Sequence, residues 1–312
     1  MWAKKIKLAS YGLAIISAIV ATPLSALASS IYYIGNSLTD SISYQNFSNI
    51  VNEQLGEEQP WGRHIIFGAP LEWIWNHPDR GLSQRPYGRY PTALNNYSWD
   101  FLSLQPFDRS LLNDIEYASR FINLAKAQNP DVQVLIHGRW LKRDKQGTSY
   151  SELWDRLYTN PESFKKSFTR DYLEQLTTSL GEADLNIKDP ILVPIGEVMY
   201  ELDQKMTKGK IPGFDSIFDI YIDRVHLDNR GRYLTTMTYL ATMYGVNPAT
   251  LDGSAIANLD PKIKQVFDRT IWEVVNESSF TNSEPVPEPF TFFGVGTALT
   301  LGMFFKRKIS KP

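Results

Sequence analysis

A serine, a histidine and an aspartate are the residues of this chain best suited to do chemistry. Ser37 stands in the sequence Gly-Asn-Ser-Leu-Thr at 35–39, directly after a run of β-branched and aromatic residues. His226 lies far downstream, three residues after Asp223. A serine hydroxyl is a weak nucleophile near neutral pH, and it needs a base such as imidazole within hydrogen-bond reach. A carboxylate beside the imidazole fixes its tautomer and stabilises its charged form. These residues therefore predict nucleophilic catalysis by Ser37, with His226 as the base and Asp223 orienting it.

The same residue types also have structural interpretations. A serine after a strand can cap a turn or a helix, and a histidine can belong to a packed core. Of the other histidines, His64 begins a predicted strand and is interpreted as structural. His77 is a candidate substrate contact, and His137 is a candidate rival base or substrate contact.

Strand-like runs alternate with helical patterns along the chain, which is typical of a parallel α/β sheet. Strands are predicted at 31–34, 64–67, 99–104, 132–136 and 191–195, and helices at 40–56, 111–128, 150–180 (interrupted near 160) and 231–245. The segment 69–91 is rich in Trp, Pro and Gly and is predicted to be a long loop. Open parallel sheets bind ligands at the carboxyl ends of their strands, so Ser37 is expected to face a crevice there.

The two motifs resemble those of the SGNH (GDSL-like) hydrolase superfamily. The sequence at 35–39 is similar to its first block, and Asp223-x-x-His226 is similar to its last block. The resemblance extends from about residue 31 to about residue 245. It implies a three-layer α/β/α sandwich with a flavodoxin-like sheet of five parallel strands. It also implies a serine esterase or hydrolase that uses a Ser-His-Asp triad and no cofactor.

The resemblance further implies an oxyanion hole. Gly68 corresponds to the second-block glycine, whose N–H is a donor, and Ser37 would add its own N–H. The superfamily's third donor is an asparagine in a Gly-x-Asn-Asp block, which the Leu-Gln-Pro-Phe sequence at 104–107 lacks. Gln105 is the candidate replacement because its side-chain amide can donate a hydrogen bond. An ordinary buried amide is the alternative.

The N-terminal residues 1–28 are predicted to be a signal peptide. They contain three lysines, an apolar run at 8–20 and Ala-Leu-Ala at 26–28. A charged region, an apolar region and a small-x-small site in this order are typical of a cleaved export signal. An uncleaved membrane anchor is the alternative.

The C-terminal residues 285–312 resemble a PEP-CTERM sorting signal. They contain Pro-Glu-Pro at 287–289, a short apolar segment at 290–305 and a basic tail. The resemblance implies an exosortase-type processing enzyme and export across the inner membrane of a Gram-negative bacterium that makes extracellular polysaccharide. The alternative is a permanent C-terminal membrane anchor, since the apolar segment is close to the length needed to span a bilayer.

Composition limits the partners. The chain contains no cysteine, which excludes disulfides and cysteine-ligated metals. No second histidine lies near His226 in the sequence, so no metal site is predicted. The net charge is −2, and nothing in the charge pattern favours a nucleic-acid partner. Residues 29–250 are predicted to form one hydrolase-like domain, followed by a helical extension and linker at 251–284.

The leading hypothesis is a secreted serine esterase that deacylates a carbohydrate, an exopolysaccharide or a related small ester. The carbohydrate follows from the setting that the PEP-CTERM resemblance implies. The alternative is a non-catalytic secreted matrix or polysaccharide-binding protein with the same fold, because the third block departs from the superfamily pattern and a fold does not guarantee a function.

Overall fold

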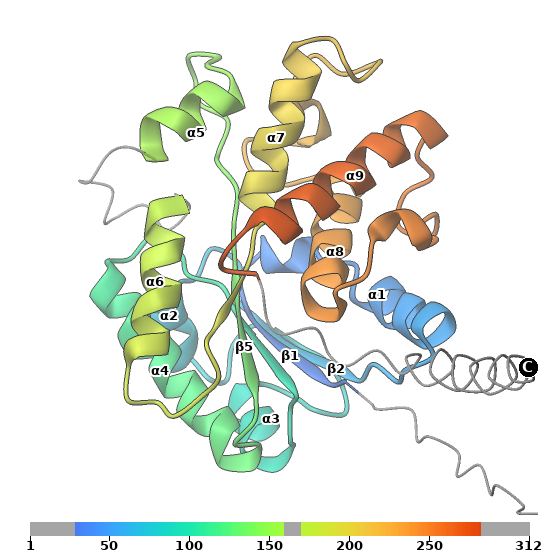
Figure 1. The fold of residues 1–312 in the computed structure, drawn as a ribbon. Helices are drawn as coiled ribbons and strands as arrows, with labels where there is room; N and C mark the ends of the chain where they lie inside the picture. Colours follow the sequence, from blue (N-terminus) through green and yellow to red (C-terminus); the bar gives the residue numbers. More distant parts are fainter. Residues whose placement is uncertain (1–28, 159–169, 282–312) are drawn as a thin grey trace, which may run out of the picture.

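A single mixed sheet forms the centre of the molecule (Figure 1). The computed structural model describes residues 29–158 and 170–281. The predicted signal peptide and the predicted PEP-CTERM signal lie outside these ranges. In the described part the strands are β1 (Ile31–Gly35), β2 (Trp61–Ile65), β3 (Leu82–Ser83), β4 (Phe101–Leu104), β5 (Gln133–His137) and β6 (Ile191–Val193). Among the helices in those ranges, we find none that is both long enough and apolar enough to span a bilayer.

The strand order is β3-β2-β1-β4-β5-β6. Strand β1 pairs in parallel with β2 on one side and with β4 on the other, and β4, β5 and β6 continue in parallel. The chain therefore winds first to one side of β1 and then to the other. Ligands of such sheets bind beyond the carboxyl ends of the strands at this reversal point, which is where Ser37 follows β1.

Helices cover both faces of the sheet (Figure 1). Side chains alternate between the faces of a strand, and in β1 Ile31 and Tyr33 face one core while Tyr32 and Ile34 face the other. The first core includes residues of α1 (Tyr44–Ile50), α5 (Tyr150–Tyr158), α7 (Ile195–Thr207), α8 (Asn229–Tyr244) and α9 (Pro261–Glu277). The second includes residues of α2 (Leu71–Asn76), α3 (Tyr90–Asn96), α4 (Leu111–Gln128) and α6 (Arg170–Glu182). The four β1 residues 31–34 are all fully buried, because both faces of this strand are covered, and the strand is therefore apolar along its whole length.

The predicted three-layer α/β fold is confirmed, and each of the five predicted parallel strands is present within a few residues. The prediction of a purely five-stranded sheet is wrong, because β3 adds a short antiparallel edge strand to β2. The predicted loop 69–91 contains this strand, all of α2 and the start of α3. These elements are too short to show a clear periodicity, since β3 has two residues and α2 has six.

The helix α7 was not predicted, although its pattern is readable. Its buried side chains include Val198, Met199, Leu202 and Met206, which recur at helical spacing. A proline before the helix and a glycine in its first turn are locally unfavourable to a helix. Packing of these four side chains on the sheet outweighs that local preference.

The segment predicted as a helical extension packs onto the domain. Phe267, Ile271 and Val274 of α9 belong to the same core as α7 and α8. After α9 the chain reaches the sheet edge, where the N–H of Leu192 in β6 donates to the carbonyl of Phe280 at 2.9 Å. This contact occupies one of the backbone groups that an edge strand would otherwise expose.

Because His64 and His137 are buried, we expect them to lower the stability of the protein in mild acid. Burial lowers the pKa of His64 to about 4 and that of His137 to about 3, against about 6.5 in an unfolded chain. Between these values the unfolded chain binds more protons than the folded protein, so the stabilisation is complete above pH 6.5 and declines as the pH falls. We expect the free energy of unfolding, measured by urea denaturation, to fall by about 2 kcal/mol per histidine between pH 7.5 and pH 5.

The variant His137→Gln isolates one of these contributions. Asp114 acts in the opposite direction, since burial raises the pKa of its carboxyl to about 7. Subtracting the unfolding free energy of the variant from that of the wild type at each pH cancels the contribution of Asp114 and of every other group that the two proteins share. A variant whose unfolding free energy depends on pH as steeply as that of the wild type would contradict the assignment.

Candidate active site

The turn after β1 carries Ser37, and Gly35 at the start of this turn packs closely against Thr39 and Gln105. A Cβ atom on Gly35 would lie 2.9 Å from Oε1 of Gln105 and closer still to Oγ1 of Thr39. Real Cβ atoms do not approach other atoms this closely, so only glycine allows the strand end to lie against Gln105. The next residue, Asn36, is fully buried, and its Oδ1 accepts a hydrogen bond from the N–H of Leu38 at 3.0 Å. The turn is therefore held on both sides of the serine.

Gln105 organises this turn from the neighbouring strand. It follows β4 and is fully buried. Its Oε1 accepts from the N–H of Asn36 at 3.1 Å, the N–H of Thr39 at 3.2 Å and the hydroxyl of Thr39 at 2.6 Å. Two backbone N–H donors at one atom identify that atom as the oxygen of the amide. The Nε2 atom is buried and has no partner among the described residues. The structure thus shows Gln105 as an acceptor for the serine turn, and its role as oxyanion donor stays a prediction.

The three predicted catalytic side chains lie in hydrogen-bond contact. Nε2 of His226 lies 2.9 Å from Oγ of Ser37, and Nδ1 of His226 lies 2.6 Å from Oδ2 of Asp223. Both ring nitrogens are therefore engaged, one by the hydroxyl and the other by the carboxylate. In the tautomer that donates from Nδ1 to the Asp223 carboxylate, Nε2 has no proton and can accept one from the hydroxyl.

Asp223 stays ionised across the range in which enzymes work. Partial desolvation by itself would raise the pKa of this carboxyl, but hydrogen bonds from the His226 N–H, the His226 ring and the Val225 N–H outweigh it. Together they lower the pKa of Asp223 to about 2. Both backbone bonds end on Oδ1, at 2.7 Å each, which leaves Oδ2 for the imidazole. One short loop thus carries both the imidazole and the carboxylate that orients it.

This loop is attached to the chain that follows β5. The indole N–H of the buried Trp140 donates to the carbonyl of Val225 at 2.7 Å. The N–H of Arg143 donates to the carbonyl of Arg224 at 2.8 Å. The structure buries the side chains of both Arg139 and Trp140. Trp140 positions the loop, a role that no local sequence signal identifies.

Gly68 lies beside the serine turn. Its backbone has φ +67°, and the carbonyl of the next residue, Ala69, accepts from Nδ2 of Asn36 at 3.1 Å. Within residues 29–158 and 170–281, the N–H groups of Gly68 and Ser37 donate to no protein acceptor. In the described residues, two backbone donors at and beside the serine turn are therefore unoccupied, which is what an oxyanion hole requires.

The other histidines lie elsewhere. His137 is fully buried, with Nδ1 2.9 Å from the Tyr239 hydroxyl, and in the described residues it forms no hydrogen bond with Ser37. His64 is buried with Nε2 2.7 Å from the Arg80 carbonyl. His77 stacks on an exposed tryptophan. In the part of the chain that the structure describes, no group of three His, Asp or Glu side chains could hold a metal ion.

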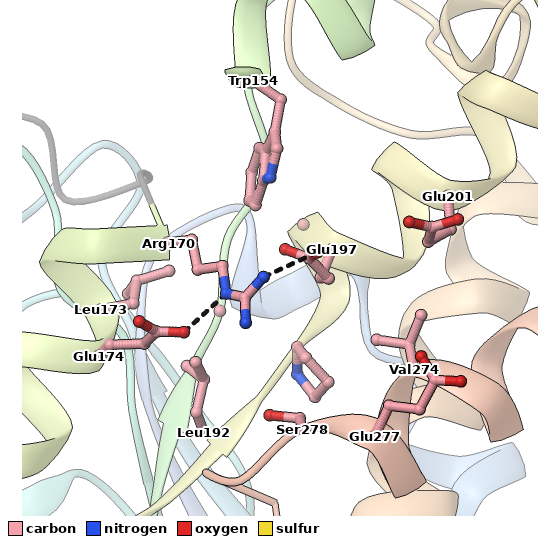
Figure 2. Close-up of a pocket in the computed structure, with 13 residues that line it drawn as sticks. Trp154, Arg170, Leu173, Glu174, Leu192, Glu197, Glu201, Val274, Glu277 and Ser278 are labelled. Carbon is pink, nitrogen blue, oxygen red and sulfur yellow. Dashed lines mark hydrogen bonds and ion pairs between the residues drawn. The ribbon is translucent and has the colours of Figure 1, made fainter. Parts of the chain in front are cut away.

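A pocket that does not include the triad is lined by charged side chains that form ion pairs with one another (Figure 2). It lies between α5, α6, α7 and α9. Arg170 reaches Glu174 at 2.6 Å and Glu197 at 3.3 Å across it, and none of the triad residues lines it. Burial raises the pKa of Glu197 despite the nearby guanidinium. Glu197 therefore faces a pocket that is separate from the triad.

Replacing Gln105 tests its role in the turn. Gln105→Met removes the oxygen and leaves two backbone N–H groups unsatisfied, so we expect kcat/KM for p-nitrophenyl acetate to fall about 10- to 100-fold. Gln105→Glu keeps an oxygen at the same place and should retain more activity than Gln105→Met. If Gln105→Glu is the more damaging change at equal stability, the amide donates to the oxyanion and the acceptor role is secondary.

Comparisons with known proteins show the fold. No family model and no curated protein matches this sequence. A DUF4886 family protein from Bacteroides uniformis is similar in structure, with a TM-score of 0.57 and 17% identity over 80% of this chain and 95% of that chain. A proposed SGNH hydrolase from Slackia heliotrinireducens follows, with a TM-score of 0.41 and 20% identity over 69% of this chain and 99% of that chain. A family 3 carbohydrate esterase from Talaromyces cellulolyticus has a TM-score of 0.44 and 10% identity over 74% of this chain and all of that chain.

Proposed function

We propose that this protein is a serine hydrolase that cleaves esters. The observation that supports it is the chain of two hydrogen bonds from Ser37 through His226 to Asp223, at 2.9 Å and 2.6 Å. The serine and the histidine are 189 residues apart in sequence, and they arise from different elements. A purely structural serine has no need of an imidazole that is itself oriented by a carboxylate.

The proposed reaction proceeds in two stages. Oγ of Ser37 attacks the ester carbonyl while its proton passes to Nε2 of His226. The N–H groups of Ser37 and Gly68 stabilise the resulting oxyanion. The ester C–O bond then breaks, and His226 returns the proton to the departing alcohol. Water attacks the acyl group with His226 as base, which releases the acid and restores the Ser37 hydroxyl.

We further propose that the substrate is an acylated carbohydrate outside the cytoplasm. The predicted export signal and the resemblance of residues 285–312 to a PEP-CTERM signal support this setting. Under this proposal an exosortase-type enzyme processes the C-terminus.

Covalent labelling tests the activated serine directly. A fluorophosphonate probe reacts with a serine whose proton is removed by a neighbouring base. Intact-mass analysis should show one adduct on the wild type, located at Ser37 by peptide mapping, and none on Ser37→Ala. A folded wild type that takes up no probe would favour the alternative, a non-catalytic polysaccharide-binding protein with this fold.

A further inference from the structure

A cleft with aromatic walls opens beside the serine turn. It has a volume of about 480 Å³, within the range of small-molecule sites. Its lining includes Phe67, Gly68 and Trp73 from the chain after β2, and Phe107 and Asp108 from the chain after β4. Since β2 and β4 flank β1 in the sheet, the two walls of the cleft rise on either side of the strand that leads to the nucleophile.

Hydrogen bonds join both walls to the residue before the nucleophile. Nδ2 of Asn36 donates to the carbonyl of Ala69, which lines the cleft. The N–H of Asn36 donates to Oε1 of Gln105, two residues before Phe107. The cleft also contains Gly68, one of the two free backbone donors. A substrate whose carbonyl oxygen accepts from Gly68 therefore extends into this cleft.

Trp73 forms a fixed aromatic surface in the cleft. Its indole stacks on the His77 ring, with centroids 3.7 Å apart and planes at 20°. Nδ1 of His77 lies 2.8 Å from the Trp73 carbonyl, which anchors the imidazole to the same helix. His77 therefore covers one face of the indole, while 43% of Trp73 remains exposed. Phe67, on the same wall, is 65% exposed.

The opposite wall is aromatic and charged. The Arg139 guanidinium lies 4.3 Å from the centre of the Phe107 ring and 3.2 Å, through Nη1, from Oδ1 of Asp108. Arg139 is fully buried, so it holds the side chains of Phe107 and Asp108 in place from the protein interior. Asp108 itself is 43% exposed, and Arg109 beside it also lines the cleft. The lining thus combines apolar ring faces with carboxylate and guanidinium groups.

We propose that Trp73, together with Phe67, binds a sugar ring of the ester substrate. A pyranose has apolar C–H faces that stack on aromatic rings and hydroxyl edges that bond to charged groups. A long acyl chain would instead require a continuous apolar lining, which Asp108 and Arg109 interrupt. This assignment rests on the proposed esterase activity, because it places the ring of the substrate next to Gly68.

The test compares two kinds of ester in one set of variants. Acetate release is measured from acetylated xylo- and manno-oligosaccharides and from ethyl acetate, which has no ring. In Trp73→Ala we expect the ratio of kcat/KM for the saccharide esters to that for ethyl acetate to fall about 10-fold. Trp73→Phe keeps an aromatic face and should lower the ratio less. Leu82→Ala is the matched control, since Leu82 is equally exposed at 43%, does not line the cleft and should leave the ratio unaltered.

Each outcome supports or overturns the assignment. An unchanged ratio in Trp73→Ala, with folding verified by circular dichroism, overturns it. Hydrolysis of p-nitrophenyl octanoate is measured in the same variants, and a loss confined to this ester also overturns the assignment, because it would identify an acyl-chain site. If the wild type hydrolyses no ester, the esterase proposal fails, and the sugar site is tested by titrating unesterified xylo- and manno-hexaose in isothermal titration calorimetry, whose signal does not depend on Trp73. Binding that Trp73→Ala abolishes and Leu82→Ala retains would then support the sugar site, and no binding by the wild type would overturn it.

Discussion

Ser37→Ala is expected to lower kcat for p-nitrophenyl acetate by a factor on the order of 10⁴ to 10⁶. The methyl group can neither attack the carbonyl nor form the acyl intermediate, so only the effects of binding and of the oxyanion donors remain. His226→Ala should cost a similar factor, since the hydroxyl loses the base that lies 2.9 Å away. The three residues act as a unit, and the double variant Ser37→Ala/His226→Ala should therefore be no slower than either single variant. Initial rates at saturating substrate measure these values.

Ser43→Ala provides the matched control for the nucleophile. Ser43 lies six positions later, just before α1, and its hydroxyl accepts a bond from Asn46 without contact to the triad. This variant should hydrolyse the ester within about twofold of the wild type, as expected for a surface substitution outside the machinery. Comparable rates for Ser37→Ala and the wild type would remove the proposed mechanism.

Asp223→Asn is expected to lower kcat by a factor on the order of 10² to 10³ through a change of tautomer. The asparagine oxygen can still accept from the N–H groups of Val225 and His226, as Oδ1 does now. Its amide nitrogen would then face Nδ1 of His226 and donate to it. The ring proton would move to Nε2, which could no longer accept the proton of Ser37. We expect a smaller effect than for a buried triad aspartate, because Asp223 is 52% exposed and water can partly replace it.

Asp228→Asn separates this effect from a general loss of loop structure. Asp228 follows the same loop, and its Oδ1 accepts from the N–H groups of Arg230 and Gly231 at the start of α8. Asparagine caps helices about as well as aspartate, so this variant should keep its rate within a few-fold. Measuring kcat and KM separately for both variants is decisive. A loss in Asp223→Asn that appears only in KM would mean that the carboxylate binds substrate and does not orient the base.

The local pattern of the sequence was sufficient to predict the parallel strands and α4, the longest helix in the described residues. Predicted helix 111–128 coincides with α4 (Leu111–Gln128), whose N-cap Ser110 accepts from the N–H of Asn113 and whose apolar face is regular. Both features depend on residues within a few positions of one another. The three catalytic candidates were also readable, because a Gly-Asn-Ser turn after a strand and an Asp-x-x-His spacing are local properties.

Tertiary structure alone decided how these residues are held and what surrounds them. Gln105 was predicted as a donor, yet two backbone N–H groups of the serine turn converge on its oxygen. The indole N–H of Trp140 donates to the carbonyl of Val225, 85 positions later. The walls of the aromatic cleft come from segments that follow β2 and β4.

These contacts join residues that are far apart in sequence, and no local pattern indicates which of them folding brings together. The sequence by itself therefore determined the strands and the candidate triad, whereas the packing of distant segments determined the geometry of the site and the cleft beside it.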